Sequence, residues 1–424
     1  MNKKIIINSF WMMSEKIISI IGLIFVTSFV AKYVGPKIFG DIAFATSLFQ
    51  IVQIIAQFGS DVIIFKRVGG NKKSGVKLII STVYLRMSAY LLITLPIMVY
   101  YWLFAHESGF IYIIGCMLSC FFMTMDVFSI YNDATLNSKI NTFVNILALV
   151  ICLALRWGVA YLNLDPKLLV IPIILTGFIP FCIRWGYFKY KISGDIKIPV
   201  RHKFRYAKYM LYVGSTFVIS TISGAIYTRM SMLILGILAS QSFVGIYSVA
   251  VSLSTCWTFV CNALITSSLP GLFSEKDEKL AINRFSKLSL LVFMVSLPFF
   301  AFIAFYGNYI INILYGYEYQ DAYYPLVILS GAAVISMLGT VSARLIAKYS
   351  GYFFLSKKSL CVAITSCIIN IPFIYNFGII GAAVATLLTE LLSMTIFNYP
   401  FKKRLVLRMH LSVFSLRRST KTFL

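Results

Sequence analysis

Twelve apolar segments follow one another along this chain, and positive charge collects in every second gap between them. The segments lie at about 9–31, 42–65, 77–103, 110–131, 142–161, 168–188, 209–236, 243–268, 288–315, 323–347, 359–376 and 379–400. Most reach the roughly 20 residues that a helix needs to cross the hydrocarbon core of a bilayer. Most of the 38 Lys and Arg residues fall at the N-terminus, in the even-numbered gaps or in the C-terminal tail, whereas the odd gaps hold only Lys32, Lys37 and Lys167. Because cytoplasmic loops carry the excess of Lys and Arg, the pattern predicts an all-α integral membrane protein with twelve crossings and both termini in the cytoplasm.

The composition excludes a water-soluble fold. Hydrophobic residues make up 59% of the 424 positions and charged residues 12%, far from the values of soluble domains. A net charge of +24 would indicate nucleic acid as the partner of a soluble protein. Here the cations border the membrane on one side, so membrane lipids with anionic headgroups are the expected partners and nucleic acid is not. Ser14, Glu15 and Lys16 interrupt the first apolar run, and we expect no cleavable signal peptide.

The residues that most often carry chemistry are better explained as parts of loops and helices. The eight cysteines lie within apolar segments without a CxxC pair, and the three histidines lie in loops or the tail, so neither disulfides nor a metal site is expected. The stretch Gly69–Ser74 has Lys72 where a phosphate-binding loop has a glycine before its Lys-Ser pair. The acidic residues at 275–278 lie among lysines, as in a solvated loop. We therefore predict no catalytic residue.

A weak internal repeat relates the second and eighth apolar segments. A shift of about 205 residues places Gly40 on Gly245 and Ser47 on Ser252. A polar stripe repeats with it, because Gln50, Gln53, Gln57 and Asp61 fall on Thr255, Thr258, Asn262 and Thr266. This spacing predicts that each stripe lies on one helix face.

The repeat predicts two six-helix lobes, 1–205 and 206–402, related by a pseudo-two-fold axis along the membrane normal, with a basic cytoplasmic tail at 403–424. Transporters built in this way hold their substrate between the halves near the midplane. Buried polar side chains cost free energy unless they find partners or water, so two matched stripes favour a shared wet cavity. The alternative is that the stripes join helices through hydrogen bonds of about 0.6 kcal/mol each.

Charges within the apolar segments need a partner or a function, since each costs at least about 2.5–3.5 kcal/mol at mid-membrane. The cations are Lys16, Arg86, Arg156, Arg184, Arg229 and Arg344, and the acids are Glu15, Asp61, Asp126 and Glu390. We interpret Arg184 and Arg344, near cytoplasmic ends, as anchors that extend to the interface. An ion pair such as Arg86 with Asp126 is an open alternative to substrate contact. The net positive lining suits an anionic headgroup, because Arg binds phosphate through charge-assisted hydrogen bonds.

Several stretches resemble one family. Gly35-Pro36-x-x-Phe39-Gly40 is similar to the first-loop signature of polysaccharide exporters, and residues 226–236 and 244–250 resemble their seventh and eighth helices. Residues 377–386 resemble the start of their last helix, and Asn370 matches an asparagine just before it. On these motifs the chain is identified as a member of the O-antigen (Wzx-type) flippases, in the multidrug/oligosaccharidyl-lipid/polysaccharide exporter (MOP) superfamily. Ser231 departs from the pattern, because many relatives carry Asp there, whereas Arg229 is retained.

The resemblance implies a flippase that moves an undecaprenyl-diphosphate-linked oligosaccharide, the O-antigen unit, across the bacterial inner membrane by alternating access. The lipid-linked oligosaccharide is the implied partner, and the O-antigen polymerase and chain-length machinery are further candidates. We predict that the substrate-binding residues are Arg229, Arg86, Arg156, Lys16, Gln50, Gln53, Gln57, Thr255 and Asn262. Coupling to a proton or sodium gradient is assigned to Asp61, Asp126 and Glu15, and no other cofactor is expected.

Two other functions stay open. A multidrug or cation antiporter of the same superfamily would need an acidic cavity, whereas the charges here lean towards cations. A membrane glycosyltransferase or O-antigen polymerase would carry catalytic groups on a large periplasmic loop, and the odd-numbered gaps are all short. The lipid II flippases resemble this family but carry fourteen helices, against the twelve expected here.

Overall fold

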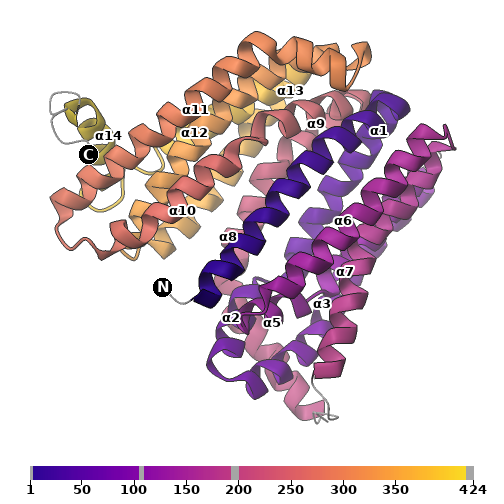
Figure 1. Ribbon diagram of the computed structural model, residues 1–424, viewed down its shortest axis with the longest axis horizontal. Coiled ribbons are helices and arrows are strands. Elements are labelled where there is room, and N and C mark those ends of the chain that lie inside the picture. Colours follow the sequence, from indigo (N-terminus) through magenta and orange to yellow (C-terminus); the bar gives the residue numbers. More distant parts are fainter. Residues whose placement is uncertain (1–2, 105–108, 192–199, 417–424) are drawn as a thin grey trace. The chain divides into compact units, whose positions relative to one another are not determined.

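The described part of the protein is built from helices and contains no strand. The computed structural model describes residues 3–104, 109–191 and 200–416 (Figure 1), and nearly all side chains from residue 24 to 191 and from 221 to 413. The chain divides into two compact units, Met1–Ala225 and Ile226–Leu424. The boundary lies within one helix, α8. Each unit is described below by itself.

The N-terminal unit holds eight elements before α8. They are α1 (Lys3–Gln57), α2 (Ser60–Gly70), α3 (Lys72–Phe104), α4 (Phe110–Met125), α5 (Phe128–Ala134), α6 (Ser138–Tyr161), the 3₁₀-helix η1 (Pro166–Leu169) and α7 (Val170–Lys191). Buried side chains around Phe49, Tyr90 and Tyr112 join α1, α3 and α4. A second cluster around Ile64, Ile79 and Tyr131 joins α2, α3 and α5. Helices α6 and α7 lie side by side (Figure 1).

The C-terminal unit begins within α8 (Val200–Leu238). It continues with α9 (Gln241–Thr255), α10 (Thr258–Ser274), α11 (Glu278–Leu314), the 3₁₀-helix η2 (Tyr317–Ala322), α12 (Tyr323–Lys348), α13 (Tyr352–Met394) and α14 (Leu405–Leu416). Helix α12 packs against α9, α11 and α13. Helix α14 packs on α11, where the Ser286 hydroxyl donates to the Met409 carbonyl oxygen at 2.8 Å.

The predicted all-helical membrane fold is confirmed. In the described ranges nine helices are long and apolar enough to cross a membrane, or ten if the bent pair α9 and α10 forms one span. Two of the long helices each join two of the segments expected from the sequence: α1 runs from the first into the second, and α13 runs from the eleventh into the twelfth. The number of twelve crossings, the six-helix lobes with their boundary after residue 205, and the cytoplasmic termini stay predictions.

Glycines with positive φ interrupt both of these long helices. Gly35 in α1 has φ 75° and ψ 171°, and Gly378 in α13 has φ 54° and ψ −125°. Glycine adopts this region without the steric cost of a Cβ atom. After Gly378 the chain turns back on itself, since a Cβ atom on Gly381 would lie 1.9 Å from the carbonyl oxygen of Phe373. The parts of α13 before and after Gly378, its first and second rods, therefore touch backbone to backbone.

We predict that Gly381→Ala destabilises the protein by about 1–3 kcal/mol, the usual cost of forcing an extra methyl group into a packed contact. The measurement is the thermal unfolding midpoint of the purified protein in detergent micelles. Gly158→Ala in α6 is the matched control, because a Cβ atom there meets nothing within 4 Å. A midpoint for Gly381→Ala equal to that of the control would contradict the close packing of the two rods.

Candidate functional site

Arg86 closes a break between two helices in the N-terminal unit. Helix α1 ends at Gln57 and α2 begins at Ser60, with Phe58 and Gly59 at φ 49° and 57°. The Arg86 side chain is only 1% exposed, and its guanidinium donates to the Ser60 hydroxyl through Nε at 3.1 Å. It also donates to the Thr124 carbonyl oxygen at 3.1 Å and forms an ion pair of 2.5 Å with Asp61, whose side chain is 51% exposed. In this conformation the Arg86 guanidinium is occupied by protein groups.

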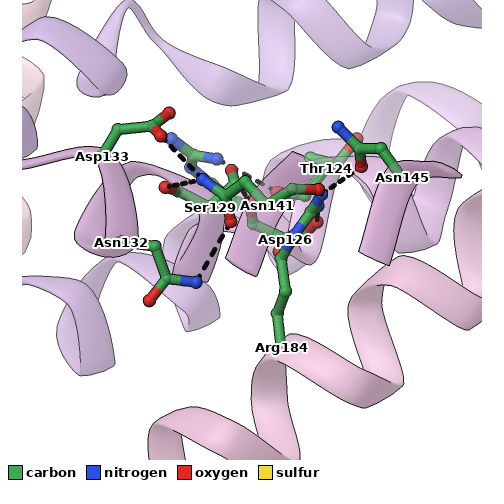
Figure 2. A network of polar contacts seen from close by, with 9 residues as sticks. Thr124, Asp126, Ser129, Asn132, Asp133, Asn141, Asn145 and Arg184 are labelled. Atoms are coloured by element: carbon green, nitrogen blue, oxygen red, sulfur yellow. Dashed lines mark hydrogen bonds and ion pairs between the residues drawn. The ribbon is translucent and has the colours of Figure 1, made fainter. Parts of the chain in front are cut away.

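A second buried arginine holds the break between α4 and α5. Arg184 on α7 is 5% exposed and forms an ion pair with Asp126, the residue that follows the end of α4. Figure 2 shows its guanidinium directed at both Asp126 and the amide oxygen of Asn145 on α6. The network continues through Asn141, whose amide nitrogen donates to the Ser129 carbonyl oxygen and to Asp133, both at 2.8 Å. One carboxylate oxygen of Asp126 and the Nε of Arg184 are buried without a protein partner in the described structure.

These contacts correct two interpretations of the sequence. Arg184 was expected to extend to the interface, but it is buried in an ion pair, so that interpretation is wrong. The pairing alternative for Arg86 is found, with Asp61 as the partner in place of Asp126. The position of Arg184 within its apolar segment placed it near the end of a helix. That position does not show which other helices pack against it.

The N-terminal polar stripe is divided between two helices. Gln50, Gln53 and Gln57 lie on α1 with partly buried side chains, whereas Asp61 follows the break on α2. The prediction that all four share one helix face is therefore wrong. The Oε1 atom of Gln50 is buried without a partner among the described residues, so this amide is available for a ligand hydroxyl.

The C-terminal stripe is divided as well. Thr255 ends α9, Thr258 begins α10, and the two helices meet at an angle of 40°. The side chains of Thr255 and Asn262 are exposed, and each donates to a carbonyl oxygen of its own helix four residues earlier, at 2.8 and 3.2 Å. Hydrogen bonds to another helix are not among these contacts, which weakens the alternative that this stripe joins helices.

Arg156 and Arg229 differ from the two arginines above because neither has an ion-pair partner among the described residues. Arg156 is half-buried on α6, beside the thiols of Cys116 and Cys152. Cys116 lies 3.4 Å from the Thr46 hydroxyl, one turn before Gln50 on α1. Arg229 is half-buried on α8, and none of the charged side chains described lies close to it. An unpaired cation in an apolar helix is costly, so both are available to an anion.

The side-chain contacts of two predicted site residues, Lys16 and Glu15, cannot be described. Lys16 and Glu15 belong to α1, but their side chains lie outside the described residues. Within the described residues no group of three or more His, Cys, Asp or Glu side chains could hold a metal ion.

A compact polar network, not predicted from the sequence, joins α8, α9 and α13 in the C-terminal unit. The Ser231 hydroxyl donates to Asn370 Oδ1 at 2.9 Å and lies 3.1 Å from the Thr386 hydroxyl, which Tyr247 approaches to 3.2 Å. Asn370 Nδ2 donates in turn to the Ser366 carbonyl oxygen at 2.8 Å. Ser231 and Asn370 stood out in the sequence only through the family resemblance, and their separation along the chain hid the contact.

Known proteins show similarity to the chain at several levels. A sequence model of the family described as "Polysaccharide biosynthesis protein" matches residues 29–324. The probable low-salt glycan biosynthesis flippase Agl15 of Haloferax volcanii is 29% identical over 234 residues, which are 54% of this chain and 47% of that protein. The matched part thus spans about half the length of this curated relative.

Two solved structures share the fold. An inward-facing multidrug resistance MATE family transporter of the MOP superfamily has a TM-score of 0.69 at 14% identity, covering 94% of this chain and 96% of its own. The lipid II flippase MurJ in an inward closed conformation has a TM-score of 0.67 at 14% identity, covering 99% and 94%. At this identity the likeness shows the fold alone. The resemblance to polysaccharide exporters that the sequence predicted is confirmed by these matches together.

We predict that Arg184→Met destabilises the protein by about 3–5 kcal/mol, because it leaves the buried Asp126 without its partner. The double change Arg184→Met with Asp126→Leu should restore most of the loss, since replacing both charges by apolar groups is often neutral. Thermal unfolding in detergent micelles measures both.

The control for this prediction is Arg408→Ala, which removes an exposed ion pair with Glu278 and should cost no more than about 1 kcal/mol. If Arg184→Met were as mild as Arg408→Ala, the buried network would not stabilise the helix break.

Proposed function

We propose, from the premise that this chain belongs to the polysaccharide biosynthesis protein family, that it is a flippase for a lipid-linked oligosaccharide. The sugars of such a lipid carry many hydroxyl groups and its phosphates carry charge. Unassisted crossing would leave all of them without hydrogen bonds in the hydrocarbon. A protein that offers matching polar groups at that depth lowers the barrier, while the lipid tail stays in the bilayer.

The observation that carries this proposal is the presence of two unpaired arginines, Arg156 and Arg229, in apolar helices. A guanidinium binds phosphate oxygens with charge-assisted and often bidentate hydrogen bonds. In the N-terminal unit Arg156 lies near the α1 face that carries Gln50, whose amide oxygen is unpartnered. A phosphate on Arg156 and a sugar hydroxyl on Gln50 would satisfy both groups.

More specifically, the proposed substrate is an undecaprenyl-diphosphate-linked O-antigen unit. The protein would move it across a bacterial inner membrane by alternating access between two six-helix lobes. The motifs at 35–40 and 377–386 support this reading through their resemblance to O-antigen flippases. The O-antigen polymerase and chain-length machinery would then receive the product. In this arrangement the protein transports and does not catalyse a covalent step.

A multidrug or cation antiporter is the alternative with a specific observation behind it, the fold shared with a MATE transporter. Cationic drugs need acidic side chains with free carboxylates. Asp61 and Asp126 are each paired with an arginine. The described intramembrane groups without an ion-pair partner include two arginines, Arg156 and Arg229, against one acid, Glu390, which leaves a net positive charge. The charges therefore favour an anionic substrate. A glycan polymerase would need catalytic groups on a long loop, and the helices from α3 to α7 follow one another through short connections.

We predict that Arg156→Ala and Arg229→Ala each lower the rate of lipid flipping about 10- to 100-fold, the range set by a lost hydrogen bond to a charged group at about 1.5–3 kcal/mol. The assay uses proteoliposomes with a fluorescent undecaprenyl-diphosphate-linked oligosaccharide. A membrane-impermeant reductant quenches only the label in the outer leaflet.

The matched control is Arg344→Ala, since Arg344 is an exposed arginine near the end of α12 and its loss should leave the rate near that of the wild type. Equal rates for Arg156→Ala, Arg229→Ala and the wild type would refute the arginine assignment. An active export of cationic dyes by the wild type, without lipid flipping, would favour the antiporter.

A further inference from the structure

Glu390 is a membrane-embedded carboxylate in the C-terminal unit to which the family resemblance and the predicted site give no role. It lies in the second rod of α13, within the apolar segment 379–400. The acids Asp61 and Asp126 form ion pairs with Arg86 and Arg184, whereas Glu390 forms none with any described residue. Its charge therefore has no fixed partner.

The neighbours of Glu390 are hydroxyl groups and one lysine. The hydroxyls of Tyr227 on α8 and Ser336 on α12 lie beside the carboxylate, and the ammonium of Lys358 on the first rod of α13 influences it from farther away. Tyr247 on α9 is the remaining titratable side chain near Tyr227. The Tyr227 hydroxyl is buried and, although it lies beside Glu390, makes no hydrogen bond of regular geometry with any described group. A buried donor without a partner costs about 1–3 kcal/mol of free energy. We therefore expect a second arrangement of these side chains, in which the Tyr227 hydroxyl donates a hydrogen bond.

One helical turn away from Tyr227 and Glu390, the polar side chains of the same two helices are already hydrogen-bonded to each other. Ser231 lies one helical turn after Tyr227 on α8, and Thr386 lies one turn before Glu390 on α13, and the two hydroxyls are 3.1 Å apart. Ser231 and Thr386 are held by Asn370 and by the Ala382 carbonyl oxygen at 2.9 Å each. Helices α8 and α13 thus share one layer of hydrogen-bonded side chains, around Ser231 and Thr386. One turn away they share a second layer, in which the Tyr227 hydroxyl lacks a regular hydrogen bond and Glu390 lacks an ion-pair partner.

We propose that Glu390 is the group that takes up and releases the proton that drives transport, in exchange between the carboxylate and the neutral acid beside Tyr227 and Ser336. In the ionised form both hydroxyls can donate to the carboxylate, and in the neutral form the acid donates its own proton to the Ser336 oxygen. The proton comes from water on one side of the membrane, adds to a carboxylate oxygen, and leaves to water on the other side. Neither state leaves the carboxyl without a hydrogen-bond partner.

The surroundings of Glu390 suit a proton better than a metal ion. The positive charge of Lys358 near the carboxylate opposes the binding of any cation, a proton included, so the number of available ligands decides between a proton and a metal ion. A metal ion would need several oxygen ligands directed at one point, and Glu390 supplies the one carboxylate of this layer. The assignment moves gradient coupling from Asp61 and Asp126, which are occupied by arginines, to the C-terminal unit.

The experiment rests on the proposed function and uses the same proteoliposomes and labelled undecaprenyl-diphosphate-linked oligosaccharide. A gradient of one pH unit should change the steady-state ratio of label between leaflets about tenfold for each proton that is coupled. In Glu390→Gln this ratio should fall to its value without a gradient, while flipping without a gradient continues. Glu318→Gln, which removes an exposed carboxylate in η2, is the control and should keep the full response.

Each outcome separates the two claims. No flipping by the wild type under any condition would overturn the proposed function, and with it this inference. Flipping by the wild type with an unchanged tenfold response in Glu390→Gln would overturn only the role of Glu390.

If Glu390→Gln proves inactive even without a gradient, Tyr227→Phe decides the question. Loss of the hydroxyl removes a donor to the carboxylate, so the pH of half-maximal flipping should rise. An unchanged pH of half-maximal flipping would contradict the assignment, because a purely structural tyrosine would not move it.

Discussion

Hydrocarbon offers no hydrogen bonds, and this constraint acts on the polar groups of the apolar helices that the structure describes. Helices satisfy their own backbones, but a break exposes carbonyl and amide groups that need another partner. In the N-terminal unit a buried arginine lies at each of two such breaks. Arg86 donates to the Ser60 hydroxyl and to the Thr124 carbonyl oxygen, and Arg184 forms an ion pair with Asp126. The planar guanidinium has five donors in a fixed arrangement, against the three of a lysine ammonium, and it can therefore serve several acceptors at once.

The same constraint divides the intramembrane charges into two groups. Arg86 and Arg184 are neutralised by carboxylates and stabilise the fold, whereas Arg156, Arg229 and Glu390 have no ion-pair partner among the described residues. Keeping a group unpaired at this depth has a cost that folding alone does not explain. We therefore propose that a substrate or a proton acts at the unpaired groups, whereas the paired groups stabilise the N-terminal unit.

The sequence predicted the helical segments well because hydrophobicity over some twenty residues is a strong and local signal. It did not predict the breaks at Phe58–Gly59 and Cys256–Trp257, since the polar spacing continues through both and a helical pattern does not show where a helix bends. The partners of Arg86 and Arg184 depend on which helices pack together, and a single sequence contains no direct record of that. Glu390 could be recognised in the sequence as an acid in an apolar segment. Its neighbours could not be predicted, because they come from the separate helices α8 and α12.

The close backbone contact between Gly381 and Phe373 has a mechanical consequence. Because the two rods of α13 are in backbone contact at the turn, we expect the hairpin to move as one rigid body. Asn370 lies on the first rod and Thr386 on the second, and both are within hydrogen-bond distance of the Ser231 hydroxyl of α8. We therefore expect α8 to move together with this hairpin, and the spacing between Tyr227 and Glu390 to change only when the hydrogen bonds of Ser231 are broken.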